Sequence, residues 1–246
     1  MELVKLLIAE FQKQKRSKTI YISMILVMAY LALTIFYTTG AVGLFDNFIY
    51  LYKFSLSYMN YLILPMILLS FLTTSFSSEY KNDTIKYIWT VPVTRVAYFL
   101  SKVIYVFLIS LIFMLIVFIT ICLAGYFTRF NDSITLELIL RFLYLCLYSA
   151  LLVSLSVIPI SIITIVTKGN GAMTNLIGSI YILISFFLMK YLQGISPLSS
   201  APHIIWYKNF EGVQNNPNIV YLLTNVLLVF IVYGVISLHI LKKQDV

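Results

Sequence analysis

Six apolar segments, each close in length to a membrane-crossing helix, follow one another along the chain. They cover residues 20–40, 58–76, 100–126, 138–166, 173–189 and 219–241. A helix needs about 20 mostly apolar residues to cross the hydrocarbon core of a bilayer. Only 11% of the residues are charged, against about 25% in an ordinary soluble domain. The sequence therefore predicts one transmembrane domain over residues 1–246 and excludes a sizeable soluble domain.

Uninterrupted apolar runs of this length indicate helices rather than strands. In lipid, every backbone N–H and C=O must be satisfied within the protein, which a single helix achieves by itself. Barrel strands would appear as segments of about ten residues with alternating hydrophobicity, and the sequence lacks that alternation. The predicted fold class is an all-α membrane protein with six transmembrane helices.

Lysine and arginine residues are unevenly divided between the two sides that six crossings would create. Most of the 17 fall in the N-terminal segment, in the loops after the second and fourth spans, and at the C-terminus. Cytoplasmic loops carry such an excess of positive charge, so both termini are predicted to be cytoplasmic. The opposite side receives Lys53, Arg129, Arg141, Lys190 and Lys208.

Two further expectations follow from composition. The richness in Ile, Lys, Asn, Tyr and Phe favours an AT-rich bacterial genome, and hence a bacterial cytoplasmic membrane. Because the basic residues flank apolar spans, they serve membrane orientation, and no nucleic-acid partner is predicted.

Residues 1–19 precede the first span and have the pattern of an amphipathic helix. Leu3, Leu6, Leu7 and Phe11 recur at helical spacing, and basic residues occupy the other faces. A helix of this kind lies in the interface, with membrane lipid as its partner. The alternative is a short basic segment that only fixes orientation. No small-residue cleavage site follows the first apolar run, so no signal peptide is expected.

The loop over residues 79–95 predicts a short helix on the cytoplasmic surface. Asn82 or Asp83 would cap it by accepting a hydrogen bond from a free backbone N–H. The helix would run over residues 84–90, with Ile85, Ile88 and Trp89 clustered by helical spacing. Pro92 then prevents the helix from continuing smoothly into the third span. The alternative is a loop that only lies at the interface and orients the spans.

Residues 190–217 form a different kind of connection. This segment is interrupted too often to span a bilayer, yet it is too apolar for an ordinary loop. Short re-entrant or interfacial helices on the outer face are predicted here. The interruptions are Gly194, Pro197, Pro202, Gly212 and Pro217.

Several kinds of chemistry are missing from the sequence. It has no phosphate-binding Gly-x-x-x-x-Gly-Lys-Ser/Thr loop, no His-Glu-x-x-His and no Gly-x-Ser-x-Gly. His203 and His239 lie far apart without acidic neighbours, and Cys122 and Cys146 fit packing positions within spans. No catalytic residue, metal site or bound cofactor is therefore predicted.

Ionisable residues are nearly absent from the centres of the spans, which argues against an ion-coupled carrier. If transport occurs, its energy is expected to enter from outside the membrane domain. Thr174 and Asn175 lie early in the fifth span and are candidates for a substrate path. Polar residues of this kind also join helices by close packing, and both interpretations stay open.

One pattern in the 79–102 region resembles a known family. Glu79, Thr84, Pro92, Arg95 and Lys102 resemble the cytoplasmic motif of membrane subunits of ABC-2 type transporters. The similarity is greatest to small permeases of bacitracin-resistance and lantibiotic-immunity exporters. The order of an N-terminal interfacial helix, six spans and a broken segment before the last span extends the resemblance over nearly the whole chain. Asp83 stands where the family often has glycine.

The resemblance implies a division of labour. Two permease subunits, from the same or different chains, form the path, and separate ATP-binding cassette subunits hold ATP and magnesium. The helix at 84–90 would be the coupling helix seated on the ATPase. The residues that the resemblance assigns to coupling are Glu79, Asp83, Thr84, Ile85, Ile88, Trp89, Pro92 and Arg95.

The implied function is export of an amphipathic peptide antibiotic or lipid-like compound, for self-immunity or resistance, by a chain that is not itself an enzyme. One alternative is a non-transporting membrane scaffold or sensor subunit. Another is an intramembrane enzyme, which would need a nucleophile–base pair or a metal cluster in the spans, and the sequence offers neither.

Overall fold

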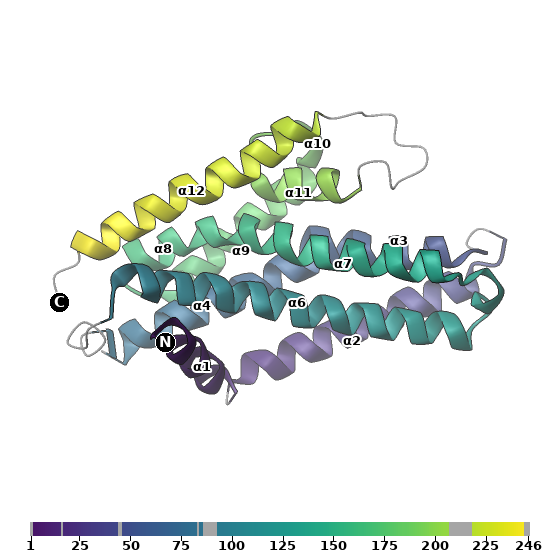
Figure 1. Ribbon diagram of the computed structural model, residues 1–246, viewed down its shortest axis with the longest axis horizontal. Helices are drawn as coiled ribbons and strands as arrows, with labels where there is room; N and C mark the ends of the chain where they lie inside the picture. The colour runs from purple at the N-terminus through teal and green to yellow at the C-terminus, as the bar shows by residue number, and fades with distance from the viewer. Residues whose placement is uncertain are drawn as a thin grey trace.

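The computed structural model describes residues 2–15, 17–43, 46–82, 84–85, 93–206 and 218–243. Over these residues the regular structure is entirely helical. The helices lie side by side along the longest axis of the molecule, and the chain runs back and forth between its two ends (Figure 1). The all-α prediction is confirmed for the described part of the chain.

Among the residues that the structure describes, five helical units are long and apolar enough to cross a bilayer. The fifth predicted span is the helix α9 (Gly171–Phe187), whose 17 residues fall just short of that length. The crossing by α9 therefore stays a prediction. The five long units are α2 (Lys18–Gly40), the unit Phe48–Lys81, α6 (Arg95–Phe127), the unit Leu136–Val166, and α12 (Ile219–Lys243).

The second unit begins ten residues earlier than the hydropathy pattern predicts. It consists of α3 (Phe48–Tyr58), the π-helix η1 (Met59–Ile63) and α4 (Leu64–Lys81). Lys53, which was assigned to an outer loop, is buried within α3. That assignment was wrong because lysine and several hydroxyl residues lower the mean hydropathy of a segment that is nevertheless packed inside the protein.

Proline residues interrupt both composite units. Pro65 follows the π-helix η1 at the first turn of α4. Pro159 lies in the 3₁₀ turn η3 (Ile158–Ile160), which separates α7 (Leu136–Val157) from α8 (Ser161–Val166). Proline has no backbone N–H and its ring clashes with the carbonyl one turn earlier, so the regular α-helical hydrogen bonding cannot pass through either position.

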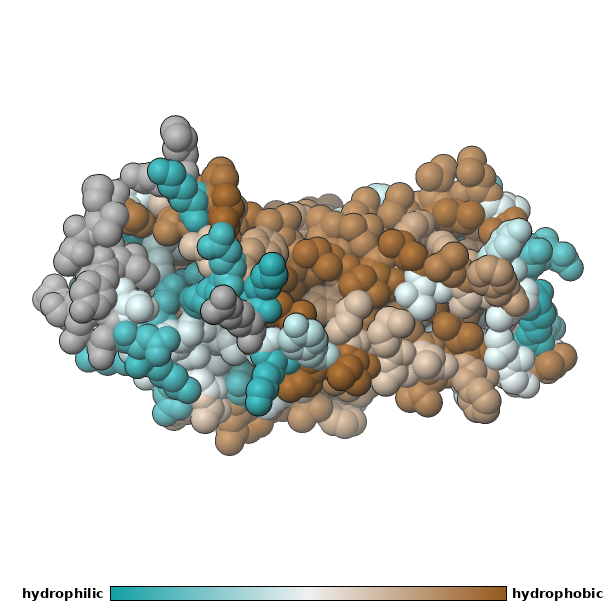
Figure 2. Space-filling model, turned by 90° about the horizontal axis from the view of Figure 1, so that it is seen from below, coloured by the Kyte–Doolittle hydropathy of each residue, from teal (hydrophilic) through white to brown (hydrophobic). Residues whose placement is uncertain are grey.

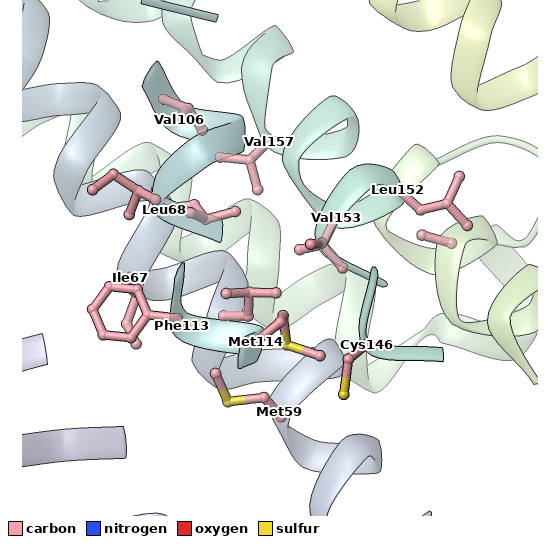
Figure 3. Close-up of a cluster of buried hydrophobic side chains, with 14 of the residues drawn as sticks. Met59, Ile67, Leu68, Val106, Phe113, Met114, Cys146, Leu152, Val153 and Val157 are labelled. Carbon is pink, nitrogen blue, oxygen red and sulfur yellow. The ribbon is translucent and has the colours of Figure 1, made fainter. Parts of the chain in front are cut away.

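The core lies where α4, α6 and α7 meet. Helices α6 and α7 are neighbouring and antiparallel (Figure 1), and their buried side chains interdigitate with those of η1 and α4 (Figure 3). Close packing of this kind holds helices together in lipid, where burial of apolar surface supplies little driving force. The residues drawn there include Met59, Leu68, Val106, Phe113, Met114, Cys146 and Val153.

The outer surface of the bundle is apolar over its middle. Hydrophobic residues cover the middle of the face in Figure 2, and hydrophilic residues gather at its two ends. Helices α2 and α12 lie on opposite sides of the bundle (Figure 1) and carry many exposed large hydrophobic side chains. A wide apolar belt between polar ends is the surface expected of a multi-pass membrane protein.

The helix α1 (Glu2–Gln14) lies across one end of the bundle, next to the carboxyl end of α4 and the first turns of α6 (Figure 1). We call this the α1 end. The expected leucine stripe faces the protein rather than lipid, since Leu3, Leu6 and Leu7 are half-buried while Val4 and Ile8 are exposed. The same inner face carries Glu10 and other polar residues, and periodicity alone does not show which face meets the bundle.

The connection before α12 contains two short helices, α10 (Met189–Leu192) and α11 (Pro197–Ile205). Helix α11 is buried between α7 and α12. Ser156 of α7 donates a hydrogen bond to the carbonyl of Pro197 at 3.2 Å, and Ser199 donates one to the carbonyl of Ser185 at 3.0 Å. Residues 207–217 of this connection lie outside the described residues.

Candidate functional site

Four charged side chains from three helices meet at the α1 end. Lys102 Nζ of α6 lies 2.8 Å from Glu10 Oε1 of α1 and 3.0 Å from Glu79 Oε2 of α4. Lys13 Nζ of α1 lies 3.0 Å from Glu79 Oε1 and 3.4 Å from Glu10 Oε1. We call these four residues the charge cluster. Two ammonium groups alternate with two carboxylates, so the charges balance.

Burial makes these charges depend on one another. Lys102 is 0% exposed, Glu10 5% and Glu79 7%. Moving a charge out of water costs several kcal/mol of desolvation energy. A buried charge is therefore tolerated only where a charged or strongly hydrogen-bonding partner offsets that cost. Loss of one member of the cluster would leave another without its partner.

Ser75 of α4 completes the contacts of Lys102. The Lys102 ammonium donates to the carbonyl oxygen of Ser75 at 2.8 Å and to its hydroxyl at 3.1 Å. The Ser75 hydroxyl in turn donates to Glu10 Oε2 at 2.7 Å. An ammonium has three N–H donors, and oxygen atoms on two neighbouring helices surround this one.

Aromatic rings close the cluster on the side of α4 and α6. Lys102 Nζ lies 4.8 Å from the ring centre of Phe76 and 4.9 Å from that of Tyr98, within the range of cation–π attraction. The Tyr98 hydroxyl donates a hydrogen bond to Glu79 Oε2. These rings exclude water and strengthen the ion pairs that they cover.

The pKa of Glu10 keeps its carboxyl deprotonated and charged at neutral pH. Burial alone would raise the pKa of this carboxyl, but the ammonium groups of Lys102 and Lys13 and hydrogen bonds from Lys102 and Ser75 together lower it to about 2. Burial and the charge of Lys102 lower the pKa of Lys13. Both residues belong to α1, outside the long spanning helices.

Helical spacing positions each member of the cluster. Ser75 and Glu79 are four residues apart on α4, and Tyr98 and Lys102 are four apart on α6, so each pair shares one helix face. On α1, Glu10, Lys13 and Gln14 point to the bundle, and the Gln14 side-chain amide donates to Thr74 Oγ1 at 2.9 Å. Helix α1 is thus held to the bundle by polar contacts in addition to its half-buried leucines.

The sequence alone does not predict this cluster. Glu10 and Lys13 belong to the segment predicted to be an interfacial helix, and Lys102 was singled out only as a residue of the family motif. One signal was present, because Lys102 falls inside the apolar segment 100–126 and a lysine at such a position requires a buried partner.

The residues predicted to couple to the ATPase do not lie together in one exposed loop. Helix α4 continues to Lys81, so Glu79 lies in the charge cluster and not in an exposed loop. Thr84 and Ile85 are helical; Thr84 is exposed and Ile85 is buried. Asp83, Ile88, Trp89 and Pro92 lie outside the described residues, so the predicted helix at 84–90 is described only over its first two positions.

Asn82 ends α4. It follows the last residue of that helix, and its backbone N–H donates to the carbonyl of Ser78 at 3.2 Å. Asp83, the other expected cap, lies outside the described residues, so the capping of the helix at 84–90 stays a prediction.

Arg95 connects the far end of the loop to the last helix. It is the first residue of α6, after Thr94, whose hydroxyl accepts a hydrogen bond from the Ala97 N–H at 3.1 Å. The Arg95 guanidinium donates to the carbonyl oxygen of Leu241 near the end of α12. Terminal carbonyls of a helix have no partner within the helix, and the arginine supplies one.

The two candidates for a substrate path point in different directions. Thr174 is fully buried, and its hydroxyl donates to the carbonyl of Asn170 at 3.1 Å. Asn175 is exposed on the outer side of α9. The structure does not bring these two side chains onto one surface. Within the described ranges, no three His, Cys, Asp or Glu residues gather to hold a metal ion.

Comparison with known protein families identifies the family of the chain. A family model described as "ABC-2 family transporter protein" matches residues 6–185, which is 180 of the 246 residues. The matched range includes the charge cluster, the 79–95 loop and nearly all of α9. Among curated proteins, none matches the chain.

Proposed function

The chain belongs to the ABC-2 family of transporter proteins, and on that premise we propose that it is the membrane-spanning subunit of an ATP-driven exporter. ABC-2 permeases are the membrane component of ABC transporters and normally pair with an ATP-binding subunit. ATP and magnesium would bind to that partner, an ATP-binding cassette subunit. A second permease subunit, the same chain or a different one, would complete the path.

The charge cluster is the observation that carries the proposal. It joins α1, α4 and α6 immediately next to the loop 79–95, where we propose that the ATP-binding subunit attaches. Because the ion pairs are buried, the three helices are expected to move as one body. Closure of the ATP-binding subunits would displace the loop, and the clamped helices would carry that displacement into the membrane as a rigid-body motion.

The arrangement of the ends supports a cytoplasmic α1 end. Helix α1, the 79–95 loop and the carboxyl end of α12 lie at the same end of the bundle (Figure 1). Most of the lysine and arginine residues belong to this end, as cytoplasmic segments require. We propose that both termini are cytoplasmic, in a bacterial membrane.

The substrate class rests on the resemblance to bacitracin-resistance and lantibiotic-immunity permeases. We propose an amphipathic peptide antibiotic or a lipid-like compound, moved out of the membrane or the cell. Such substrates partition into the bilayer, and an apolar belt gives them access to the bundle from its side.

The first test is reconstitution of the chain with candidate ATP-binding subunits in lipid vesicles. ATP hydrolysis and movement of a labelled amphipathic peptide are measured with Ile88→Ala/Trp89→Ala in the loop. The double variant should insert normally but lose peptide movement and peptide-stimulated hydrolysis. Tyr126→Ala/Phe127→Ala, an exposed aromatic pair at the opposite end, should retain both.

Two outcomes would argue against the proposal. Failure of any ATP-binding subunit to associate would favour the non-transporting scaffold or sensor. Unchanged coupling in the loop variant would remove the role assigned to residues 84–90, even if transport itself were observed.

A further inference from the structure

An open apolar groove of about 520 Å³ runs along α2 where this helix faces η1. Its walls come almost entirely from one side of α2, with a single residue contributed by the second helical unit. The lining residues are Ile22, Ile25, Leu26, Ala29, Tyr30, Leu33 and Ile63.

The groove offers no free polar group to a ligand. Tyr30 is the one lining residue with a side-chain hydroxyl, and that hydroxyl already donates to the carbonyl oxygens of Ser55 at 2.8 Å and Phe54 at 3.1 Å. A ligand with hydrogen-bonding groups would leave them unsatisfied here. Hydrocarbon is therefore the chemistry that the groove accepts.

The length of the groove corresponds to one leaflet of a bilayer. At about 1.5 Å of rise per residue, the path from Ile22 to Leu33 is about 16 Å long. The hydrocarbon core of a bilayer is about 30 Å thick, so a groove that starts near the α1 end extends to roughly the bilayer centre. That depth suits one acyl chain lying along α2.

A lysine marks the polar end of the groove. The lining positions on α2 repeat at three and four residues, and the same spacing leads back from Ile22 to Lys18, the first residue of α2. Lys18 is exposed, and its ammonium has no ion pair or hydrogen bond with any residue that the structure describes. The ammonium of Lys15, one turn earlier in the chain, is also exposed and has no such partner.

We infer that the groove binds one acyl chain of an anionic phospholipid from the leaflet next to the α1 end, with the lipid phosphate on Lys18. The apolar walls accept the chain, and the lysine at its headgroup end selects negative charge. This lipid site does not depend on the proposed transport function. The exposed apolar face of α12, on the opposite side of the bundle, serves as the comparison surface.

Bromolipid quenching of a single tryptophan tests the site in the full chain. Leu26→Trp places the reporter in the groove, and Trp89→Phe with Trp206→Phe removes the other tryptophans. In phosphatidylcholine vesicles, dibrominated phosphatidylglycerol should quench the reporter at about fivefold lower mole fraction than dibrominated phosphatidylcholine, as one lysine contact implies. Leu33→Trp serves as a second reporter at the other end of the groove.

Matched variants separate the site from general attraction to the protein. Lys18→Gln should remove the preference for phosphatidylglycerol, whereas Lys242→Gln, an exposed lysine at the end of α12, should keep it. Ala29→Phe should weaken quenching by both lipids, and Met28→Phe, exposed outside the groove, should not. A reporter at Leu228→Trp on α12 should show no preference.

Three results would overturn the inference. Equal quenching by the two lipids in the parent would remove the anionic selectivity. An equal effect of Lys242→Gln and Lys18→Gln would make the selectivity a property of overall charge. Absence of quenching by either lipid would mean that protein, such as a second copy of the chain, covers the groove.

Discussion

The two ends of the bundle are held together by different chemistry. At the α1 end, Lys102 and Glu10 form a 2.8 Å ion pair whose side chains are 1% and 7% exposed. At the opposite end, Arg129 and Asp46 form a 3.3 Å pair with side chains 27% and 62% exposed. Water screens the second pair and not the first. The same kind of contact therefore fixes helix positions at one end and contributes little at the other.

Aromatic packing takes the place of charge at the end away from α1. Phe142 stacks on Tyr52 with ring centres 5.2 Å apart, and the ring centre of Phe118 lies 5.3 Å from that of Phe142. Phe48 fills the space over Gly125, where an added Cβ would lie 2.7 Å from its ring. The helices are thus held together by balanced charges at the α1 end and by close packing of aromatic side chains at the opposite end.

Removing the central cation should have the largest effect. Lys102→Met leaves two buried carboxylates facing each other with only Lys13 to neutralise them. We expect a loss of about 3–5 kcal/mol in the free energy of unfolding, seen as a lower midpoint of thermal unfolding in detergent. The variant Glu10→Gln/Lys102→Met, which removes one charge of each sign and leaves Lys13 paired with Glu79, should recover most of the loss. An unchanged midpoint in Lys102→Met would contradict the assigned role of the cluster.

Acidification should release α1 only at low pH. The pKa of Glu10 is lowered from 4.5 to about 2, so its contribution to docking is complete above pH 4.5 and is lost as the pH falls towards 2. The contribution is on the order of 3 kcal/mol. A spin label at Gln12→Cys, on the exposed side of α1, should keep its mobility from pH 7 to 5 and gain mobility below about 4.5. Glu10→Gln should lose most of this dependence.

At the opposite end, close packing of side chains should contribute most to stability. Gly125→Ala forces the Phe48 ring to move within a packed site, and we expect a loss of about 1–3 kcal/mol in unfolding free energy. Gly40→Ala is the matched control, because nothing lies within 4 Å of the added Cβ. Equal midpoints of thermal unfolding for the two variants would show that this end tolerates overpacking.

Neutralising the exposed pair should have the smallest effect. Asp46→Asn removes the ion pair, but Arg129 still donates to the carbonyl oxygens of Thr38 at 2.9 Å and Ala41 at 3.0 Å. We expect a change below about 1 kcal/mol, which added salt should reduce further. A loss as large as that of Lys102→Met would erase the distinction between the two ends.

The helices could be predicted from the sequence because lipid leaves the backbone few alternatives. Their boundaries could not always be predicted, as α3 shows. Lys53 and its hydroxyl neighbours have the composition of a loop, and only the surrounding helices make that segment a buried helix. For α1, the spacing of leucines predicted a helix but not which side would meet the protein.

The charge cluster could not be predicted because its partners are distant in the chain. Glu10 and Lys102 are 92 residues apart, and no local pattern specifies that two such residues will meet. The resemblance singled out Glu79 and Lys102 as motif residues, whereas the structure adds Glu10 and Lys13 as their partners. The helix at 84–90 stays a prediction, since most of it lies outside the described residues.

The separation of Glu10 and Lys102 also sets an order of events during synthesis. Ribosomes add about 5–20 residues per second, so Lys102 follows Glu10 by about 5–18 seconds. During that interval α1 has left the ribosome, but the two helices that form its binding site, α4 and α6, have not both been made. Its exposed apolar residues Val4 and Ile8 can hold it at the membrane surface meanwhile. Docking of α1 is therefore a late step that reports whether the second and third helical units have inserted together.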